Sequence, residues 1–218
     1  YNNNNNGELI QNNDNIKTFN DIFEHGSQLD LKKNALGSRK VLGKDPKTGK
    51  VIWSDFIYED WETVRRRRLN FGSGLQYIYH KILGKSSDDK WHLGIYSPNR
   101  TEWLISDWAA SGFSIATVAL YDTLGFETTE YILNHAEIPI LVTTYDKVPK
   151  LLKISDKIPL LKAIIVIPPL IPNPDLAPSA FNILKEWCLD KNINLFEFAE
   201  VEQLGKLNPS PKRIPKPE

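Results

Sequence analysis

Several features that mark specialised proteins are scarce in this 218-residue sequence. Cys188 is its single cysteine, which excludes an internal disulfide framework. Lysine plus arginine and aspartate plus glutamate number 27 each, so the net charge is zero and no general field favours nucleic acid or an anionic membrane. No apolar run approaches the roughly 20 residues of a transmembrane helix. With 41% hydrophobic residues, we expect a globular protein without a nucleic-acid partner or a transmembrane segment.

Familiar catalytic motifs are also missing. The sequence has no Walker loop, no GxGxxG after a strand, no GxSxG elbow and no CxxC or HExxH. Gly72 and Gly74 fall inside a predicted helix, so they are expected to admit a neighbouring backbone and not a phosphate. The four histidines are His25, His80, His92 and His135. They lie on different predicted elements without ligand spacing, so we expect no shared metal site, and His135 is predicted in the core or at its boundary.

What the sequence does contain is an alternation of two hydrophobic periods. Continuous apolar or β-branched runs predict buried strands at 92–96, 115–120, 140–143 and 163–167, the second buried on both faces. Helical spacing separates the runs, and Trp103 and Trp108 are predicted to be largely buried on the first intervening helix. Strands that alternate with helices predict an α/β fold with a mostly parallel sheet and helices on both faces.

The residues before this region predict a tail, a short helix and a β-hairpin. Asparagine dominates residues 1–15, which are expected to be disordered. Thr18 can cap a helix, and its apolar stripe is predicted to carry Phe19, Ile22 and Phe23. Two runs, 35–42 and 51–58, flank a turn that contains Pro46 and Gly49, which predicts a hairpin beside the sheet.

Asp60 precedes the longest helical pattern. Its predicted buried face carries Val64, Arg68, Phe71, Leu75, Ile78 and Ile82. The basic run 65–68 lies in the same helix and is expected to form a solvated face, with phosphate binding as the alternative.

The residues after the central region predict the end of the sheet and a linker. Helices are expected at 148–154 and 181–188, with a proline-rich surface loop at 168–178 between them. The sheet is expected to end at residue 167, and 195–198 to form a short strand. Residues 208–218 consist mainly of Pro, Lys and Arg and predict a linker.

One loop is a candidate ligand site. Tyr121, Asp122 and Thr123 follow the second predicted strand, and polar residues at the carboxyl ends of parallel strands are where α/β folds place ligands. In the alternative interpretation, Asp122 or Thr123 only caps the following helix.

Several stretches resemble a known family. LGIYSPNRTEWLISDWAA, VALYDTLGFETTEYILNHAEIPILVTT and FEFAEVEQLGKLNPSPKRIPKP are similar to the amino-terminal part of fungal fatty acyl-CoA synthetases of the AMP-forming adenylate superfamily, especially the peroxisomal medium-to-long-chain type. Residues 99–103 match the family's Asn-x-x-Glu-Trp pattern, 121–125 its Tyr-Asp-Thr-Leu-Gly loop, 36–39 its LGSR and 72–75 its Gly-Ser-Gly-Leu. The resemblance covers about residues 20–218.

This resemblance implies a ligase that converts a fatty acid, ATP and CoA to acyl-CoA, AMP and pyrophosphate, with Mg²⁺ as a further cofactor. In the family a phosphate-binding loop, an aromatic-Gly-x-Thr-Glu motif, a ribose-binding Asp and a late Lys carry the chemistry. None of these occurs here, so no catalytic, cofactor-binding or metal-binding residue is carried over, and this chain is expected to bind none of the cofactors.

The implied organisation is a disordered tail at 1–15, an incomplete AMP-binding-type domain at 16–207, and a linker at 208–218 that leads to the phosphate loop. The partners would be the fatty acid and the remaining part of the same polypeptide. The resemblance implies a peroxisomal location; otherwise the enzyme would be cytoplasmic or peripheral on the endoplasmic reticulum or lipid droplets. The first residue is Tyr1 and not Met, which favours a fragment. The alternative is a stand-alone, non-catalytic α/β binding or interaction module.

Overall fold

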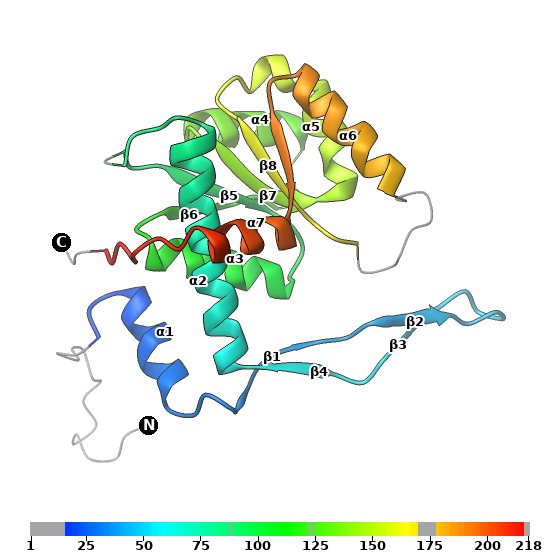
Figure 1. Ribbon diagram of the computed structural model, residues 1–218. Helices are drawn as coiled ribbons and strands as arrows, with labels where there is room; N and C mark the ends of the chain where they lie inside the picture. The colour runs from blue at the N-terminus through cyan, green and yellow to red at the C-terminus, as the bar shows by residue number, and fades with distance from the viewer. Residues whose placement is uncertain (1–15, 88, 122, 124, 170–177, 216–218) are drawn as a thin grey trace, which may run out of the picture.

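A five-stranded parallel sheet forms the centre of the fold. The computed structural model describes residues 16–215, apart from residues 88, 122, 124 and 170–177. The strands are β5 (His92–Tyr96), β6 (Ala116–Ala119), β7 (Ile140–Thr144), β8 (Ala163–Ile167) and β9 (Asn194–Glu197), in the spatial order β6-β5-β7-β8-β9 (Figure 1). All neighbouring strands are parallel, which confirms the predicted α/β fold.

The position of two strands differs from the sequence prediction. The sheet does not end at residue 167, because β9 pairs with β8 and places Leu195 opposite Ile164. The prediction that β6 is buried on both faces is wrong, because β6 is an edge strand and its Ala116 is exposed. An apolar run indicates that a segment forms a strand, but it does not give the order of strands in the sheet.

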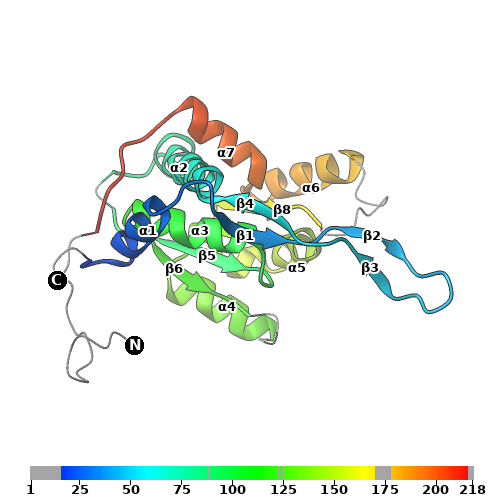
Figure 2. The same cartoon turned by 90° about the horizontal axis from the view of Figure 1, so that it is seen from below.

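Helices cover both faces of the sheet. One face carries α2 (Trp61–Tyr77), α3 (Thr101–Gly112) and α7 (Phe198–Leu207), whereas α4 (Phe126–His135), α5 (Val148–Lys153) and α6 (Pro178–Asp190) cover the other (Figures 1 and 2). Short 3₁₀ turns, η2 (Tyr145–Lys147) and η3 (Ser155–Lys157), flank α5. Successive side chains of a strand point to opposite faces, so Ile165 joins the first core cluster and Ile164 the second.

The long helix α2 begins as the sequence predicts. The Asp60 carboxylate accepts a hydrogen bond from the Thr63 N–H at 2.8 Å and caps the helix. Leu75 and Ile78 on its predicted core face are fully buried. Ile82 is 39% exposed, because the chain continues from α2 into one π-helical turn, η1 (Ile78–Ile82), which changes the angular spacing of the side chains.

Close contact between α2 and α7 depends on glycine. A Cβ atom at Gly74 would collide with the Val201 carbonyl, and one at Gly205 would collide with the backbone of Asn70. These contacts confirm the predicted close approach at Gly74. The sequence prediction missed α7 itself: Phe198, which it assigned to a strand, is the first residue of this helix.

The basic run 65–68 does not form a solvated face. Successive residues of a helix point about 100° apart, so the four arginines take different directions. Arg68 is 1% exposed, and its Nη1 lies 2.6 Å from Oε1 of Glu24. Arg65 and Arg67 also form ion pairs, and only Arg66 is exposed. The expectation of a solvated face is therefore wrong.

The short helix α1 (Phe19–Gln28) packs beside α2. Thr18 and Asp21 form a capping box at its beginning, as the sequence predicts for Thr18. Only Phe23 of the predicted apolar stripe is buried, whereas Phe19 is 51% and Ile22 is 55% exposed. No helix among the described residues is long and apolar enough to cross a membrane.

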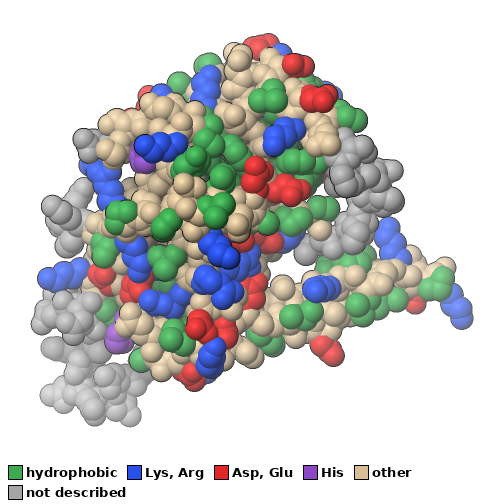
Figure 3. Space-filling model, in the orientation of Figure 1, with side chains coloured by type: hydrophobic (Ala, Val, Ile, Leu, Met, Phe, Trp, Pro, Cys, Tyr) green, Lys and Arg blue, Asp and Glu red, His purple; other side chains and the backbone are tan. Residues whose placement is uncertain are grey.

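The predicted hairpin forms an arm that projects from the sheet (Figures 1 and 2). Its base pairs β1 (Asn34–Ser38) with β4 (Ile57–Asp60), and its tip pairs β2 (Val41–Lys44) with β3 (Val51–Trp53), both antiparallel. Figure 3 shows Lys or Arg side chains near the tip and hydrophobic side chains along the arm.

Three side chains that the sequence places in or beside the core are less buried than predicted. His135 is exposed and stacks on Tyr131 with ring centroids 5.2 Å apart. Trp103 and Trp108 are only partly buried, because they cover the rim of the first core cluster. The Trp108 ring lies 5.1 Å from that of Phe23.

Residues 208–215 have neither helix nor strand, but they lie against the helices. The Ser210 N–H donates a hydrogen bond to Oγ of Ser73 at 3.1 Å. Lys212 pairs with Glu24 at 2.6 Å, and the Ser114 hydroxyl donates to the Arg213 carbonyl. Three contacts along this segment hold it on the α1–α2 side of the molecule.

Candidate functional site

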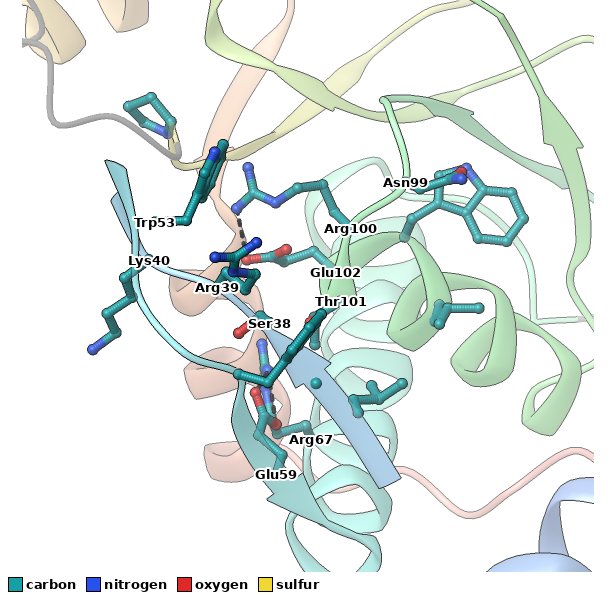
Figure 4. Close-up of a pocket in the computed structure, with 16 residues that line it drawn as sticks. Ser38, Arg39, Lys40, Trp53, Glu59, Arg67, Asn99, Arg100, Thr101 and Glu102 are labelled. Carbon is teal, nitrogen blue, oxygen red and sulfur yellow. Dashed lines mark hydrogen bonds and ion pairs between the residues drawn. The ribbon is translucent and has the colours of Figure 1, made fainter. Parts of the chain in front are cut away.

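A pocket of about 800 Å³ lies between the arm and the beginning of α3 (Figure 4). The arm contributes Leu36, Gly37, Ser38, Arg39, Lys40, Trp53, Phe56 and Glu59, and the opposite wall contains Asn99, Arg100, Thr101, Glu102, Trp103 and Leu104; Arg67 and Pro169 complete the lining. Residues 99–104 follow β5, and Pro169 follows β8. The pocket therefore lies beyond the carboxyl ends of the strands, where α/β sheets place ligands.

The wall formed by α3 contains the Asn-x-x-Glu-Trp motif. Arg100 Nη1 donates to the Pro168 carbonyl at 3.1 Å, and Arg100 Nη2 lies 3.2 Å from Oε1 of Glu102. These contacts tie the beginning of α3 to the end of β8, 68 residues away. The side chains of Arg100 and Glu102 are 12% and 15% exposed, so the ion pair is mostly enclosed. The exposed Asn99 points away from the centre of the pocket (Figure 4).

The wall formed by the arm is amphipathic. Arg39 Nε donates to the Ser54 carbonyl at 2.7 Å, and the Arg39 guanidinium lies 5.7 Å from the centre of the Phe56 ring. Trp53 and Phe56 are 38% and 58% exposed, large fractions for aromatic rings on a pocket wall. The adjacent Lys40 points outward (Figure 4).

An ion-pair cluster centred on Arg67 of α2 forms the floor of the pocket. Arg67 lies between Glu59, at 2.7 Å, and Glu202 of α7, at 2.8 Å. Burial opposes the charge of Arg67, but hydrogen bonds to Glu202 and Glu59 outweigh it and raise the guanidinium pKa. Burial raises the pKa of Glu202, which Arg67 only partly offsets. The floor thus joins the arm, α2 and α7.

This arrangement can bind a ligand, but it offers no nucleophile activated by a base. The described residues that line the pocket include neither histidine nor cysteine. No group of His, Cys, Asp and Glu among the described residues could hold a metal ion. The chemistry available is the binding of a molecule that is part apolar and part charged.

The loop predicted from the sequence as a ligand site lies elsewhere. Tyr121 is 65% exposed and Thr123 is exposed after edge strand β6, and neither lines the pocket. Thr123 does not cap α4, because the N-cap is Gly125. Asp122 lies outside the described residues. The sequence analysis did not predict this pocket as a site. It did identify the motif at 99–103 and the hairpin, which form the two walls of the pocket.

Known proteins provide an independent comparison. The family model described as AMP-binding enzyme matches residues 46–206. The peroxisomal acyl-CoA ligase 891 of Penicillium roqueforti is 30% identical over 87% of this chain, and fatty acyl-CoA synthetase A of Dictyostelium discoideum is 32% identical over 93%. The chain spans about a quarter of the length of these relatives, 26% and 27% respectively.

Solved structures agree on the fold. The adenylation domain of a carboxylate reductase from Mycobacterium chelonae superposes with a TM-score of 0.72 over 95% of this chain and 31% of that one, at 12% identity. A carboxylic acid reductase didomain from Segniliparus rugosus, solved in complex with AMP, gives 0.70 over 92% of this chain and 28% of that one, at 15% identity. The family model and the sequence relatives together establish that the chain belongs to the AMP-binding enzymes.

Proposed function

We propose that this chain is the amino-terminal part of a fatty acid–CoA ligase, which converts a fatty acid, ATP and CoA to acyl-CoA, AMP and pyrophosphate. The observation that carries the proposal is the similarity to relatives named as acyl-CoA ligase and fatty acyl-CoA synthetase over 87% and 93% of the chain. The peroxisomal name of the Penicillium relative supports a peroxisomal location. ATP, Mg²⁺ and CoA would bind to the complete enzyme, with the catalytic residues outside residues 16–207.

The 218 residues alone should not catalyse the reaction. Adenylation depends on positioned cations and backbone donors that stabilise charge on the reacting phosphate, and removing one such donor commonly costs about 10²–10³ in rate. The sequence contains none of the family's phosphate, adenine or ribose motifs. We therefore expect no ATP–pyrophosphate exchange by this chain with octanoate, laurate or oleate.

The test is to express the complete open reading frame that contains these residues and to measure AMP release. Release should require the fatty acid, ATP and CoA, and acyl-CoA should form in equal amount. The 218-residue chain is the matched inactive control. If the complete protein forms no acyl-CoA from any of the three acids, the ligase proposal is wrong and the stand-alone module is favoured.

We also propose that the Tyr121-Asp122-Thr123 loop contacts a ligand of the complete enzyme. The exposed Tyr121 ring and the absence of a capping role for Thr123 support this proposal. In the complete enzyme, Tyr121→Ala should raise KM for one substrate at least several-fold. Tyr131→Ala, which removes a similarly exposed tyrosine from α4, should not. Equal KM values for both variants and the wild type would remove the loop from the site.

A further inference from the structure

We propose that the distal part of the arm, residues 40–53, docks on an anionic phospholipid bilayer, with its lysines at the lipid head groups and Leu42 and Ile52 at the outer acyl methylenes. This surface has no role in the proposed function, and its docking does not depend on the ligase reaction. Three features of the distal arm point to a membrane: its shape, its charge and its exposed apolar side chains.

A fixed turn at the end of the arm holds lysine side chains out in solvent. The Asp45 N–H donates to the Lys50 carbonyl at 2.8 Å, and the Asp45 carboxylate accepts hydrogen bonds from the N–H groups of Lys47 and Thr48. These bonds use only the backbone and Asp45, and the exposed side chains of Lys44, Lys47 and Lys50 take no part in them. Because the arm projects from the rest of the molecule, its tip can reach a flat surface (Figure 1).

The charge of the distal arm is strongly positive. Residues 40–53 contain four lysines and one aspartate, a net charge of +3, whereas the whole chain is neutral. The flanking Arg39 and Asp55 cancel each other. None of the four lysines forms an ion pair within the described part of the chain. Each lysine that approaches an anionic lipid surface strengthens binding about fivefold, so the excess charge favours such a surface.

Exposed apolar side chains accompany these lysines. Leu42 is 68% and Ile52 is 45% exposed. Leu42 is next to Gly43, which pairs with Ile52 in the hairpin register, so the two apolar residues lie close together near the tip. Further exposed large side chains continue along the arm toward its base: Trp53, Phe56, Ile57 and Tyr58. Figure 3 shows this apolar surface along the arm and the positive charge near its end.

The combination of lysine and apolar side chains favours a bilayer over a protein partner. Lysine is depleted at protein–protein interfaces, whereas segments that lie on membranes combine Lys or Arg with Trp, Phe or Leu. A second copy of the arm would bring the same excess of positive charge and would be repelled. An anionic bilayer supplies negative head groups and, directly beneath them, an apolar layer for Leu42 and Ile52.

Co-sedimentation with vesicles of phosphatidylcholine, with and without phosphatidylserine, tests the proposal on the 218-residue chain and on the complete protein. We expect both proteins to bind the vesicles that contain phosphatidylserine, and the binding to weaken as NaCl is raised, because salt screens the attraction. Vesicles of phosphatidylcholine alone should bind far less. Substituting Lys44, Lys47 and Lys50 together by Ala should weaken binding to the anionic vesicles about a hundredfold.

The matched control substitutes Lys153, Lys162 and Lys206 by Ala. These lysines are exposed, lie outside the arm and form no ion pair with any described residue, so the net charge of the protein changes by the same amount. The control variant should bind phosphatidylserine vesicles as the wild type does. Both triple variants should fold, because they alter only exposed side chains.

A fluorescent label distinguishes insertion of the arm from adsorption by charge alone. Cys188 is the single cysteine of the chain and is fully buried, so the cysteine of the variant Leu42→Cys can be labelled selectively. An environment-sensitive label there should brighten and shift to the blue when phosphatidylserine vesicles are added. The same label in Leu160→Cys, at a residue that is 45% exposed and outside the arm, should not change.

Absence of binding to phosphatidylserine vesicles, an equal loss in the two triple variants, or an unchanged label in Leu42→Cys overturns the proposal. Arm-dependent binding by the 218-residue chain that is absent from the complete protein also overturns it, because the rest of the polypeptide then covers the arm. Self-association of the wild type that Leu42→Ala abolishes would assign the arm to a second copy, and the proposal would be wrong.

Discussion

At the scale of residues, Glu24 forms more ion pairs than any other carboxylate among the described residues. Arg65, Arg68 and Lys212 all form ion pairs with it, at 3.0, 2.6 and 2.6 Å. The three cations come from α2 and from the segment that follows α7, so one side chain of α1 joins three parts of the chain. Arg68 is the buried member of the set and also donates to the Trp108 carbonyl at 2.7 Å.

Replacing Arg68 should therefore be far more damaging than replacing its neighbour. Arg68→Met removes the donors that satisfy Glu24, Asn20 and the Trp108 carbonyl, so we expect a loss of about 3–5 kcal/mol in the free energy of unfolding. Arg66→Met changes the same residue type on the exposed side of α2 and should stay within about 0.5 kcal/mol. Urea denaturation measures both, and similar losses would argue against the buried network.

Glu24 should also make the fold sensitive to acid. Burial opposes its ionisation, but Lys212 and Arg68 outweigh burial and hold the pKa below the ordinary value of 4.5. A carboxyl with a lowered folded pKa stabilises the fold above its unfolded pKa, and this contribution is lost as pH falls through the folded pKa. For this reason, we expect the urea concentration at the unfolding midpoint of the wild type to decrease as the pH is lowered below about 4.5.

The variant Glu24→Gln isolates this contribution. It should lower the free energy of unfolding by about 1.5–3 kcal/mol at pH 7 and show a weaker decline toward acid than the wild type. Glu202, whose pKa burial raises, acts with the opposite sign but is common to both proteins. Glu186→Gln, an exposed change on α6, should follow the wild type at every pH. If the free energy of unfolding declines toward acid equally in Glu24→Gln and the wild type, Glu24 is not the source of the acid sensitivity.

At the scale of elements, the crossing of α2 and α7 depends on the missing side chains of Gly74 and Gly205. Either Gly→Ala change would push a methyl group into the opposite backbone, which cannot give way as a flexible side chain can. We expect each change to cost about 1–3 kcal/mol. Gly26→Ala in α1, where no atom lies within 4 Å of the new methyl group, should stabilise by about 0.5–1 kcal/mol. Thermal denaturation should show a lower melting temperature for Gly74→Ala and Gly205→Ala, and a higher one for Gly26→Ala, than for the wild type.

Sequence patterns predict elements of this fold better than they predict how the elements meet. The strands at residues 92 and 163, the Asp60 cap and the close approach at Gly74 all follow from local periodicity or residue type. The edge position of β6 and the pairing of β9 depend on strand order, which local periodicity does not contain. At the start of α7, Phe198 alternates with Phe196 across Glu197, which is the spacing of a strand, so the sequence gives no sign that the helix begins there.

The pocket shows the same limit. Arg67 meets Glu202 across 135 positions in the sequence, and Arg100 meets the Pro168 carbonyl across 68. No spacing rule relates residues so far apart. The motif at 99–103 and the hairpin were visible in the sequence, but their approach across one cavity follows from the tertiary fold. The Tyr121 loop was selected because it follows a strand, and its structure leaves its role as a proposal.

At the scale of the whole molecule, the sheet links two cores. The first core cluster includes Ile165 and packs under α2, α3 and α7, whereas the second includes Ile164 and packs under α4, α5 and α6. The two isoleucines are neighbours on β8, and both are fully buried. Loss of β8 would therefore expose both clusters, so the two should unfold together.

Substitutions on opposite faces of β8 test this coupling. Ile164→Ala and Ile165→Ala should each cost about 2–5 kcal/mol, since each leaves a cavity in one cluster. Fluorine-labelled tryptophans report the clusters separately, because Trp187 packs against the second and Trp61 and Trp108 against the first. Either substitution should shift all three signals to one common midpoint. Leu42→Ala on the arm, where the side chain is 68% exposed, should leave that midpoint unchanged. If Ile164→Ala shifts Trp187 alone, the two faces of the sheet unfold independently, and the single cooperative unit inferred from β8 is wrong.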